Sequence, residues 1–430
     1  MNEIIKIDAW NRNIALATQI NQKFIVELLN EEYSIFSPLC FEHDRFAIVG
    51  IRNISQEIDK IGVVADSING AYGKGYFEKY YVDTKGSFPS MLDRLSFIGS
   101  NGLGALEYAP SDSASLLDSK ELYFSLLEFK NESLNLLESN SINPDIAKLI
   151  AKSNSGAGGA KAKAVIDYNP VTKSIHLSQI HSDTPKGYIK CIVKFNTKKD
   201  AEESNKYNQD LKLEYLYYLL AKECGIQISN CYLESDEDSN YYFITERFDV
   251  TKTGERLHMH SLAGLLGHNT ESFSMGYEAL FRTGRMLSVP IVDREQMFKS
   301  MIFNLVFANR DDHSRNFSFL MDKNYNWRYA PSYDLTYAAS DAGLKWHQLT
   351  IDKKPAHRVK SLALKKIALL CDIQNPFEIM AEFIAIKHNR LTILANKLDI
   401  AEPLIETILE DTKYIDSIFR TPSRSKKELK

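Results

Sequence analysis

The chain has 430 residues, of which 44% are hydrophobic and 25% are charged, and its formal net charge is −4. This length exceeds what one hydrophobic core usually supports, so we expect two or three domains. The small net charge excludes a surface that binds polyanions all over, and any nucleic-acid contact would need a local patch or a partner.

The N-terminal twenty residues include acidic side chains and lack the apolar core of a signal peptide. No run of 18 apolar residues occurs, so we predict no membrane span and expect a cytoplasmic protein. The five cysteines include no Cys-x-x-Cys pair. That pattern is typical of small buried side chains in a reducing compartment, and it gives no support to a zinc site.

The first part of the chain, residues 1–112, predicts a mixed α/β subdomain with short strands such as FAIVGIRN. It ends in SNGLGALEYAP, where SNGLG is typical of a turn and the rest of a short strand that Pro110 ends. Residues 114–152 then show helical spacing of apolar residues, with a break before Asn143. Strands are predicted over 163–168, 174–179 and 187–195, followed by a helix over 210–225 and strands over 228–235 and 240–250.

A glycine-rich segment, SGAGGAKAKA, lies between the second of these helices and the first strand. Backbone amides in such a turn can hold a phosphate group, and Lys161 or Lys163 would add positive charge. The segment lacks Gly-Lys-Ser/Thr and is therefore not a Walker A loop. An ordinary flexible loop remains the alternative interpretation.

A lysine, Lys194, lies within the apolar strand segment IVKF. A charge there costs free energy unless it is paired, and Glu214 lies on the helix that follows. A strand lysine paired with a helix glutamate is how protein kinases hold nucleotide phosphates. The alternative is that Lys194 lies on the exposed face of an edge strand.

The apolar strand in YYFITERFDV ends where the character of the sequence changes. In a two-lobed kinase this is the position at which backbone groups bind adenine. Glu246 and Phe248 are therefore candidates for the adenine contact, on the evidence of their position alone.

From about residue 255 the pattern is mostly helical, with one hairpin predicted over residues 317–330. Asp293 and Gln296 have the spacing of a capping box and predict the start of a helix at Asp293. This helix leads into the polar loop NRDDHSRN, and the hairpin then returns the chain to Asp334. Two carboxylates and an amide near one another suit a magnesium ion, which prefers hard oxygen ligands.

The spacing distinguishes the two adjacent aspartates of that loop. In the kinase pattern H-R-D-x-x-x-x-N the metal-binding asparagine follows the catalytic aspartate by five residues, and Asn316 follows Asp311 by five. Asp311 is thus the candidate base, and Asp312 is expected to support the loop. His313 either lines a nucleotide site or braces the loop. A solvated loop of Asx turns is the alternative for the whole segment.

Together these segments resemble the HipA family of serine/threonine kinase toxins from bacterial type II toxin–antitoxin modules. The resemblance runs over most of the chain and rests on VVADSINGAYGKGYFEKYY, LDRLSFIGSNGLGALEYAP, GGAKAKA, YIKCIVKF, ITERFDV, NRDDHSRNFSFL and YAPSYDLTYA.

The resemblance implies an α+β, bilobal, protein-kinase-like fold related to PI3/4-kinases. It implies a mixed N-terminal lobe over 113–249, preceded by the extra subdomain 1–112, and an all-α C-terminal lobe over 250–430. It implies Asp311 as catalytic base. Residues implied to bind ATP or magnesium, the latter through Asn316 and Asp334, are Gly158, Gly159, Ala160, Lys161, Ala162, Lys163, Lys194, Glu246, Arg247, Phe248, His313, Ser314, Arg315, Asn316, Tyr333 and Asp334.

The resemblance also implies an activity and partners. Family members phosphorylate a serine of their own glycine-rich loop and so inactivate themselves, which makes Ser153 and Ser155 the candidates here. The expected partners are a helix-turn-helix antitoxin, operator DNA through that antitoxin, and a protein substrate such as glutamyl-tRNA synthetase or another translation factor. Two alternatives remain, a non-catalytic co-repressor that binds the antitoxin, and a small-molecule kinase on the same fold.

Overall fold

The chain, in a computed structural model, divides into two compact units. The first unit comprises Met1–Glu202, Asn230–Asn269 and Ser318–Asn326, and the second comprises Glu203–Ser229, Thr270–Phe317 and Trp327–Lys430. The structure describes residues 4–20, 23–29, 36, 46–50, 64, 66–67, 71–111, 122–138, 143–155, 161–178, 184–197, 209–266, 275–338, 346–356 and 359–419.

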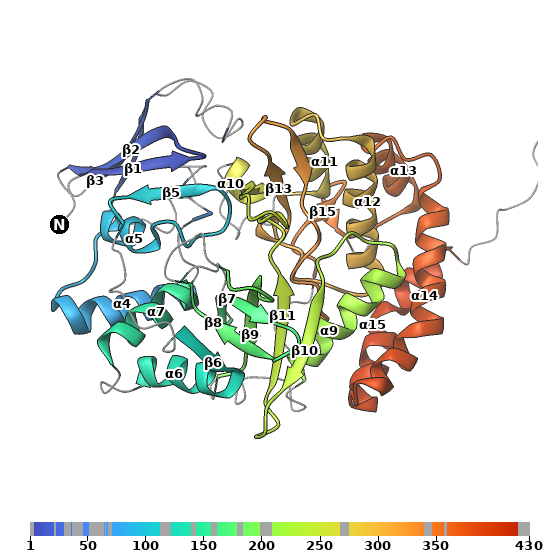
Figure 1. The fold of residues 1–430 in the computed structure, drawn as a ribbon. Coiled ribbons are helices and arrows are strands. Elements are labelled where there is room, and N and C mark those ends of the chain that lie inside the picture. Colours follow the sequence, from blue (N-terminus) through green and yellow to red (C-terminus); the bar gives the residue numbers. More distant parts are fainter. Residues whose placement is uncertain are drawn as a thin grey trace, which may run out of the picture. The chain divides into compact units, whose positions relative to one another are not determined.

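A five-stranded antiparallel sheet begins the first unit, in the order β4-β3-β2-β1-β5 (Figure 1). Ile5, Ile7 and Ala9 of β1 are fully buried and alternate with exposed or half-buried neighbours, as expected for a sheet with one covered face. The strands are Ile4–Ala9 (β1), Arg12–Ile20 (β2), Lys23–Leu28 (β3), Phe46–Gly50 (β4) and Leu106–Ala109 (β5).

Two helices, α4 (Ala71–Lys85) and α5 (Met91–Ile98), precede β5 in the sequence. A capping box starts α5, because Ser90 Oγ accepts a hydrogen bond from the Asp93 amide and the Asp93 carboxylate accepts one from the Ser90 amide. The short strand predicted before Pro110 is confirmed as β5.

The second sheet of this unit has six strands in the order β10-β11-β9-β7-β8-β6. Its central strands carry nearly continuous buried runs, as expected for strands covered on both faces. The strands are Tyr123–Ser125 (β6), Lys163–Asn169 (β7), Ser174–His176 (β8), Ile189–Phe195 (β9), Cys231–Ser235 (β10) and Tyr241–Glu246 (β11). All of these except β6 confirm predicted strands.

Two helices, α6 (Leu126–Glu138) and α7 (Pro144–Ser155), pack on the six-stranded sheet (Figure 1). Phe129 and Ile150 share one buried cluster with Ile166 and Val193 of the sheet. The unit is completed by β12 (His258–Ser261), α10 (Leu262–Leu266) and β13 (Ser318–Met321), of which β12 and β13 pair antiparallel.

The helical structure predicted for residues 114–152 is wrong at Tyr123–Ser125, where β6 pairs with β8, and residues 114–121 lie outside the described part of the chain. α6 begins at Leu126, where Ser125 and Glu128 form a capping box: the Glu128 amide donates to Ser125 Oγ and the Ser125 amide donates to the Glu128 carboxylate. The apolar residues of β6 fit a helical period as well as an alternating one, so spacing alone could not separate the two.

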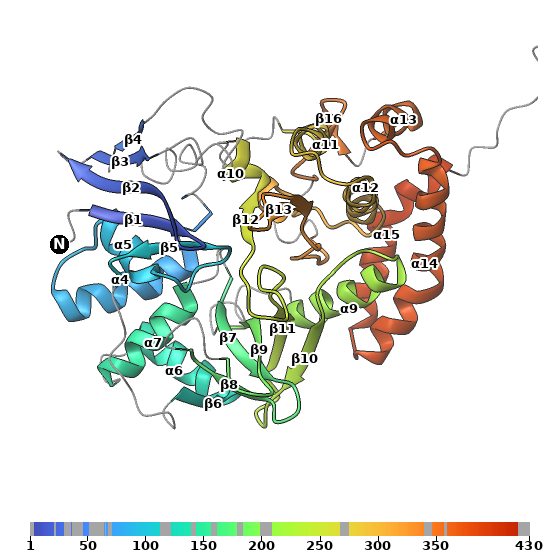
Figure 2. The same cartoon turned by 45° about the horizontal axis from the view of Figure 1, so that its top comes forward.

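The second unit is mostly helical, and α14 packs against α9, α12 and α15 (Figure 2). Its elements are Asp210–Glu223 (α9), Tyr277–Met286 (α11), Ile291–Val306 (α12), Ser314–Asn316 (η4, a 3-10 turn), Trp327–Tyr329 (β14), Thr350–Ile351 (β15), Lys354–Pro355 (β16), Ser361–Leu370 (α13), Pro376–Lys397 (α14) and Glu402–Phe419 (α15). The helix predicted to stop at Gly225 is confirmed, with this glycine at φ +65°. The short β15–β16 pair had no counterpart among the predicted elements.

The predicted capping box at Asp293 is wrong. α12 begins two residues earlier, after Pro290, and Asp293 lies in its first turn. Its carboxylate instead accepts both arms of the Arg328 guanidinium, at 2.6 and 2.8 Å, and the Tyr329 amide at 3.0 Å. Gln296 binds the Gln227 amide. The non-local partners outcompeted the local cap, and they fasten α12 to β14.

Four cysteines lie in the part of the chain that the structure describes, and all four are buried and free. Cys40 lies outside it.

No described helix combines the length and apolar character needed to cross a bilayer.

A buried histidine, His258, holds an N-terminal residue against β12. Its Nε2 atom lies 2.8 Å from the Phe36 carbonyl oxygen, and the two rings meet edge to face. Burial, reinforced by His260, lowers the pKa of His258 to about 3. The imidazole is therefore neutral in the folded protein at all but strongly acidic pH.

We predict that His258 makes the first unit less stable in mild acid. An unfolded histidine takes up a proton below about pH 6.5, whereas folded His258 does not until about pH 3, so stability falls by about 1.4 kcal/mol per pH unit in between. His258→Gln keeps a donor and should remove this loss, about 2 kcal/mol at pH 5. Urea unfolding of both proteins between pH 7 and 4.5 measures it, and parallel curves would contradict the prediction.

Candidate active site

The polar loop after α12 is closed by a hydrogen bond between Asn316 and Asp311, which are five residues apart. The side-chain amide of Asn316 donates to the Asp311 carbonyl at 2.7 Å, and the Asn316 backbone amide donates to the His313 carbonyl at 2.9 Å. The turn η4 lies between these contacts. The Asn316 side-chain nitrogen makes the contact with Asp311, and the side-chain oxygen is a ligand type that magnesium accepts.

The Asp311 carboxylate is open to solvent, with 44% of its side chain exposed. His313 Nε2 lies 3.7 Å from it, while His313 Nδ1 is buried and has no hydrogen-bond partner among the described residues. A buried polar atom without a partner is costly. This arrangement favours a His313 that lines a ligand site over one that braces the loop.

Asp312, next in the chain, is fully buried. One carboxylate oxygen accepts from the Tyr277 hydroxyl at 2.6 Å and from His347 Nδ1 at 2.9 Å, and the other accepts from the Gln348 amide at 2.7 Å. Three donors from two distant segments therefore hold this side chain. Asp312 anchors the loop and faces away from solvent.

The hydrogen bonds continue from this anchor to the start of the loop. Asn304 donates to the Tyr277 hydroxyl, and Asn309 donates to the Asn304 side-chain oxygen at 3.0 Å. Burial, followed by the Asp312 charge, raises the pKa of Tyr277 well above its usual range. The phenol therefore keeps its proton and remains a donor to Asp312, so the loop is fixed at both ends.

Asp334 follows the loop in the sequence, beyond β14. Its backbone has φ +52°, a left-handed conformation that aspartate adopts more readily than most residues. The neighbouring Tyr333 hydroxyl donates to the Arg315 carbonyl at 2.6 Å and so ties this segment to η4, which begins at the buried Ser314. The carboxylate of Asp334 and the amide oxygen of Asn316 are donors of the kind that magnesium prefers.

In the first unit, two of the candidate lysines occupy paired positions. Lys163 of β7 lies opposite Lys194 of β9, and the two are only 9% and 7% exposed. Lys194 Nζ also lies 5.7 Å from the centre of the Phe243 ring. Like charges opposite each other on neighbouring strands repel, so placing the two lysines here costs free energy that neighbouring negative groups offset.

Of the candidate residues in the glycine-rich loop, the structure describes those from Lys161 onward. Gly158, Gly159 and Ala160 lie outside the described residues. At its end, Lys161 is exposed and Ala162 is buried.

The two candidate serines differ. Ser153 lies in the last turn of α7 and is 9% exposed, and its hydroxyl donates to the Val165 carbonyl at 2.6 Å. The side chain of Ser155 lies outside the described part of the chain. The Ser153 hydroxyl is thus already engaged.

The segment after β11 is held by its side chains. The Glu246 carboxylate accepts from the Tyr232 hydroxyl at 2.7 Å and from Asn230, and the Glu246 amide donates to the Asn230 carbonyl. The Arg247 guanidinium binds Asp249 through two nitrogens, at 3.0 and 2.6 Å. Phe248, which follows Arg247, is half-buried.

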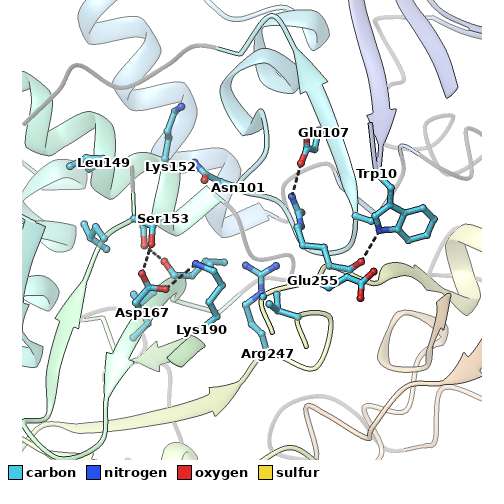
Figure 3. A pocket seen from close by; sticks show the side chains of 18 of the residues that line it. Trp10, Asn101, Glu107, Leu149, Lys152, Ser153, Asp167, Lys190, Arg247 and Glu255 are labelled. Atoms are coloured by element: carbon cyan, nitrogen blue, oxygen red, sulfur yellow. Dashed lines mark hydrogen bonds and ion pairs between the residues drawn. The ribbon is translucent and has the colours of Figure 1, made fainter. Parts of the chain in front are cut away.

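A cavity of about 350 Å³ lies within the first unit beside this segment (Figure 3). Ser153, Lys190 and Arg247 line it, and the Lys190 ammonium binds the buried Asp167 carboxylate at 3.1 Å. Figure 3 shows Trp10 and Glu107 at its opposite side. The cavity is thus lined both by β5, which carries Glu107, and by β7, which carries Asp167.

The candidate residues are divided between the units. Those from Lys161 to Phe248 belong to the first, and those from Asp311 to Asp334 belong to the second. Lys194 and Glu214 likewise fall in different units, and their pairing stays a prediction.

The partners of Asp312 were not foreseen from the sequence. His347 lies 35 residues away in a segment without a recognisable motif, and Tyr277 lies 35 residues before it. The one indication in the sequence that these residues bind a buried carboxylate is that each has a side chain able to donate a hydrogen bond, a histidine and a tyrosine.

Both the sequence and the fold are similar to those of known proteins. The sequence matches the family model of the HipA-like C-terminal domain over residues 155–407. A search of the curated proteins finds no match.

Two solved structures are similar to the chain. One is the Shewanella oneidensis MR-1 toxin–antitoxin system HipA, solved with HipB and its operator DNA: 16% identity, TM-score 0.63 and 96% of each chain covered. The other is the Helicobacter pylori proinflammatory kinase CtkA: 11% identity, TM-score 0.35, and 54% of this chain and 89% of that chain covered. The first likeness shows the predicted fold, kinase-like and mixed α/β with a helical C-terminal region.

We predict that the two adjacent aspartates differ in their effect on stability. Asp312→Asn places an amide nitrogen against a donor and removes a buried charge, and it should lower the free energy of unfolding by about 3 kcal/mol. Asp311→Asn, at an exposed carboxylate, should change it by less than about 0.5 kcal/mol. Urea denaturation of both variants tests this, and equal losses would show that Asp312 is not the anchor.

Proposed function

The chain belongs to the family of the HipA-like C-terminal domain, whose model matches residues 155–407, and we propose that it is an ATP- and magnesium-dependent protein serine/threonine kinase toxin of a toxin–antitoxin module. The observation that carries the proposal is the loop after α12, which exposes Asp311 while Asn316 closes the loop onto the Asp311 carbonyl. Phosphoryl transfer needs this combination of a fixed loop and an accessible base.

In this proposal Asp311 acts on the substrate hydroxyl. Its carboxylate orients a serine or threonine hydroxyl and accepts the proton as the oxygen bonds to the γ-phosphorus of ATP, while the bond to the β-phosphate oxygen breaks and ADP leaves. Because Asp311 is open to solvent, a protein segment can reach it. Asp312 takes no part in the transfer and keeps the loop in place.

The remaining candidates would bind the nucleotide. Lys163 and Lys194 supply positive charge for phosphate oxygens, and the Glu246–Phe248 backbone binds adenine. Asn316 and Asp334 would hold magnesium, which when bound neutralises phosphate charge.

We further propose the roles that only the resemblance suggests. The domains would be 1–112, 113–249 and 250–430. The Gly158–Lys163 loop, with His313, Ser314, Arg315 and Tyr333, would lie around the nucleotide. A net charge of −4 supports a helix-turn-helix antitoxin as the component that contacts operator DNA, and the Shewanella oneidensis HipA was solved with HipB and operator DNA. A translation factor, with glutamyl-tRNA synthetase tested first, would be the substrate, and its phosphorylation would inhibit growth.

Self-phosphorylation would occur at Ser155. The hydroxyl of the other candidate, Ser153, is nearly buried and donates to the Val165 carbonyl. Phosphorylation there would require this contact to break and part of α7 to open.

We predict that Asp311→Asn abolishes phosphoryl transfer without loss of ATP binding. Loss of a general base typically costs a factor of about 10² to 10⁴ in rate, and the exposed side chain should be replaceable without unfolding. Incorporation of labelled phosphate from Mg-ATP, and calorimetric titration with ATP, measure the two properties. Asp399→Asn, at an exposed carboxylate outside the loop, is the matched control.

A wild-type protein that binds ATP but never transfers phosphate would overturn the proposal. If Asp311→Asn and Asp334→Asn both leave growth arrest intact in cells, the arrest comes from a non-catalytic co-repressor instead. Transfer to metabolites alone, in a panel of small molecules, would indicate a small-molecule kinase.

We also predict which serine carries phosphate. Mass spectrometry of the purified protein after incubation with Mg-ATP should find phosphate on Ser155, and Ser155→Ala should abolish the signal. Ser153→Ala is the matched variant and should leave it unchanged. Phosphate on Ser153 in both the wild type and Ser155→Ala would contradict the assignment.

A further inference from the structure

The chain turns back on itself directly after the Glu246–Phe248 segment. Val250 pairs with Arg256 in an antiparallel bridge, the Leu257 amide donates to the Asp249 carbonyl at 2.8 Å, and the Thr251 amide donates to the Glu255 carbonyl. The result is a small hairpin over residues 249–257. It leads from the proposed adenine segment to β12.

Asp249, at the base of this hairpin, joins two parts of the first unit. It is 2% exposed, and the Arg247 guanidinium binds it through two nitrogens. The same carboxylate accepts the Gly104 amide at 2.6 Å. Gly104 belongs to the SNGLG turn, so one buried carboxylate connects Arg247 to the N-terminal subdomain.

Two arginines complete the connection from the other direction. Arg256 donates to the Ser100 and Gly102 carbonyls at 2.8 and 2.7 Å, and Arg247 donates to the Gly102 carbonyl at 3.3 Å. Three backbone groups of the turn, namely the Ser100 and Gly102 carbonyls and the Gly104 amide, are therefore bound by side chains of this segment. We call the turn 100–104, Arg247, Asp249 and Arg256 the clasp.

The turn has little freedom to fit any other way. Gly104 has φ +80°, and a Cβ atom there would lie 2.9 Å from the Met259 amide nitrogen. Asp249 and Arg247 form a charged pair. Burial alone would raise the pKa of Asp249, but the Arg247 guanidinium and the Gly104 amide lower it overall, so Asp249 is ionised.

We propose that Asp249 is a positioning residue through which the 100–104 turn holds the Glu246–Phe248 segment in the conformation that binds ATP. This proposal rests on the proposed function. It assigns to Asp249, a residue outside the nucleotide site, an effect on ATP binding. Arg247 lies between the two residues whose backbone would bind adenine. Figure 3 shows its side chain beside Lys190 at the cavity.

The short backbone segment that would bind adenine is the same segment that Asp249 holds in place. The Arg247 amide donates to the Lys190 carbonyl at 2.9 Å, while its side chain is fixed by Asp249. If the clasp opens, Arg247 loses its buried partner and must turn towards solvent, and the neighbouring peptide groups turn with it. ATP affinity then falls, whereas the chemistry at Asp311, on another segment, does not change.

The test compares Asp249→Asn with Asp66→Asn in the full-length protein. Asp66 is a matched control, because it also connects the N-terminal subdomain to the rest of the unit but does so through His260 and Ser261 instead of Arg247. Asp249→Asn should raise the KM for ATP and the calorimetric Kd about tenfold or more, with the maximal rate of self-phosphorylation within about threefold of wild type.

Asp66→Asn should lower the thermal midpoint but leave the Kd for ATP unchanged. An unchanged Kd in Asp249→Asn, or the same rise in both variants, would overturn the proposal. Gly104→Ala should also raise the Kd, and the double variant with Asp249→Asn should bind ATP no more weakly than the weaker single variant. Additive losses would show that the turn does not act through Asp249. If Asp249→Asn does not fold, Arg256→Lys provides the milder change.

Amide hydrogen exchange tests the clasp without any nucleotide. Exchange at Glu246 and Arg247 should rise in Gly104→Ala and stay unchanged in Asp66→Asn. Unchanged exchange in Gly104→Ala would overturn the clasp even if the protein is a kinase. A wild type that binds no ATP would overturn the proposed function, and the exchange result would still decide whether the clasp positions this segment.

Discussion

The buried carboxylate of Asp312 is the constraint on which the loop after α12 depends. A fully buried charge is costly unless it is hydrogen-bonded, and here a phenol, an imidazole and a backbone amide donate to it. Those donors come from Tyr277, His347 and Gln348, so the loop cannot move without exposing three polar groups at once. Rigidity of the loop is the direct consequence.

The fixed position of Asp312 explains why the adjacent residues Asp311 and Asp312 have different roles. Successive side chains in an extended loop point in opposite directions, so when Asp312 is drawn inward, Asp311 is directed outward. Asn316 then closes the loop on the Asp311 carbonyl instead of its carboxylate, which leaves the carboxylate open. The pair Asp-Asp is thus one anchor and one exposed acid, and neither could be exchanged for the other.

Sequence patterns predicted what depends on short-range spacing. The five-residue step from Asp311 to Asn316 corresponds to a real hydrogen bond, and the lysines at 163 and 194 do lie in buried strands. What the patterns missed depends on partners far away in the chain. Asp293 has the spacing of a cap but binds Arg328, because a bidentate guanidinium with a backbone amide offers more than a local cap.

The same reasoning changes how the SNGLG turn is understood. From sequence it is a turn with a specific resemblance to a family and no evident chemistry. In the structure its carbonyls and one amide meet the side chains of Arg247, Asp249 and Arg256, which explains why glycine is needed where a Cβ would strike the next strand. Because Arg247 also belongs to the proposed adenine segment, the contact of Gly102 with Arg247, 145 residues later in the chain, is the means by which the turn would act on nucleotide affinity under the proposed function.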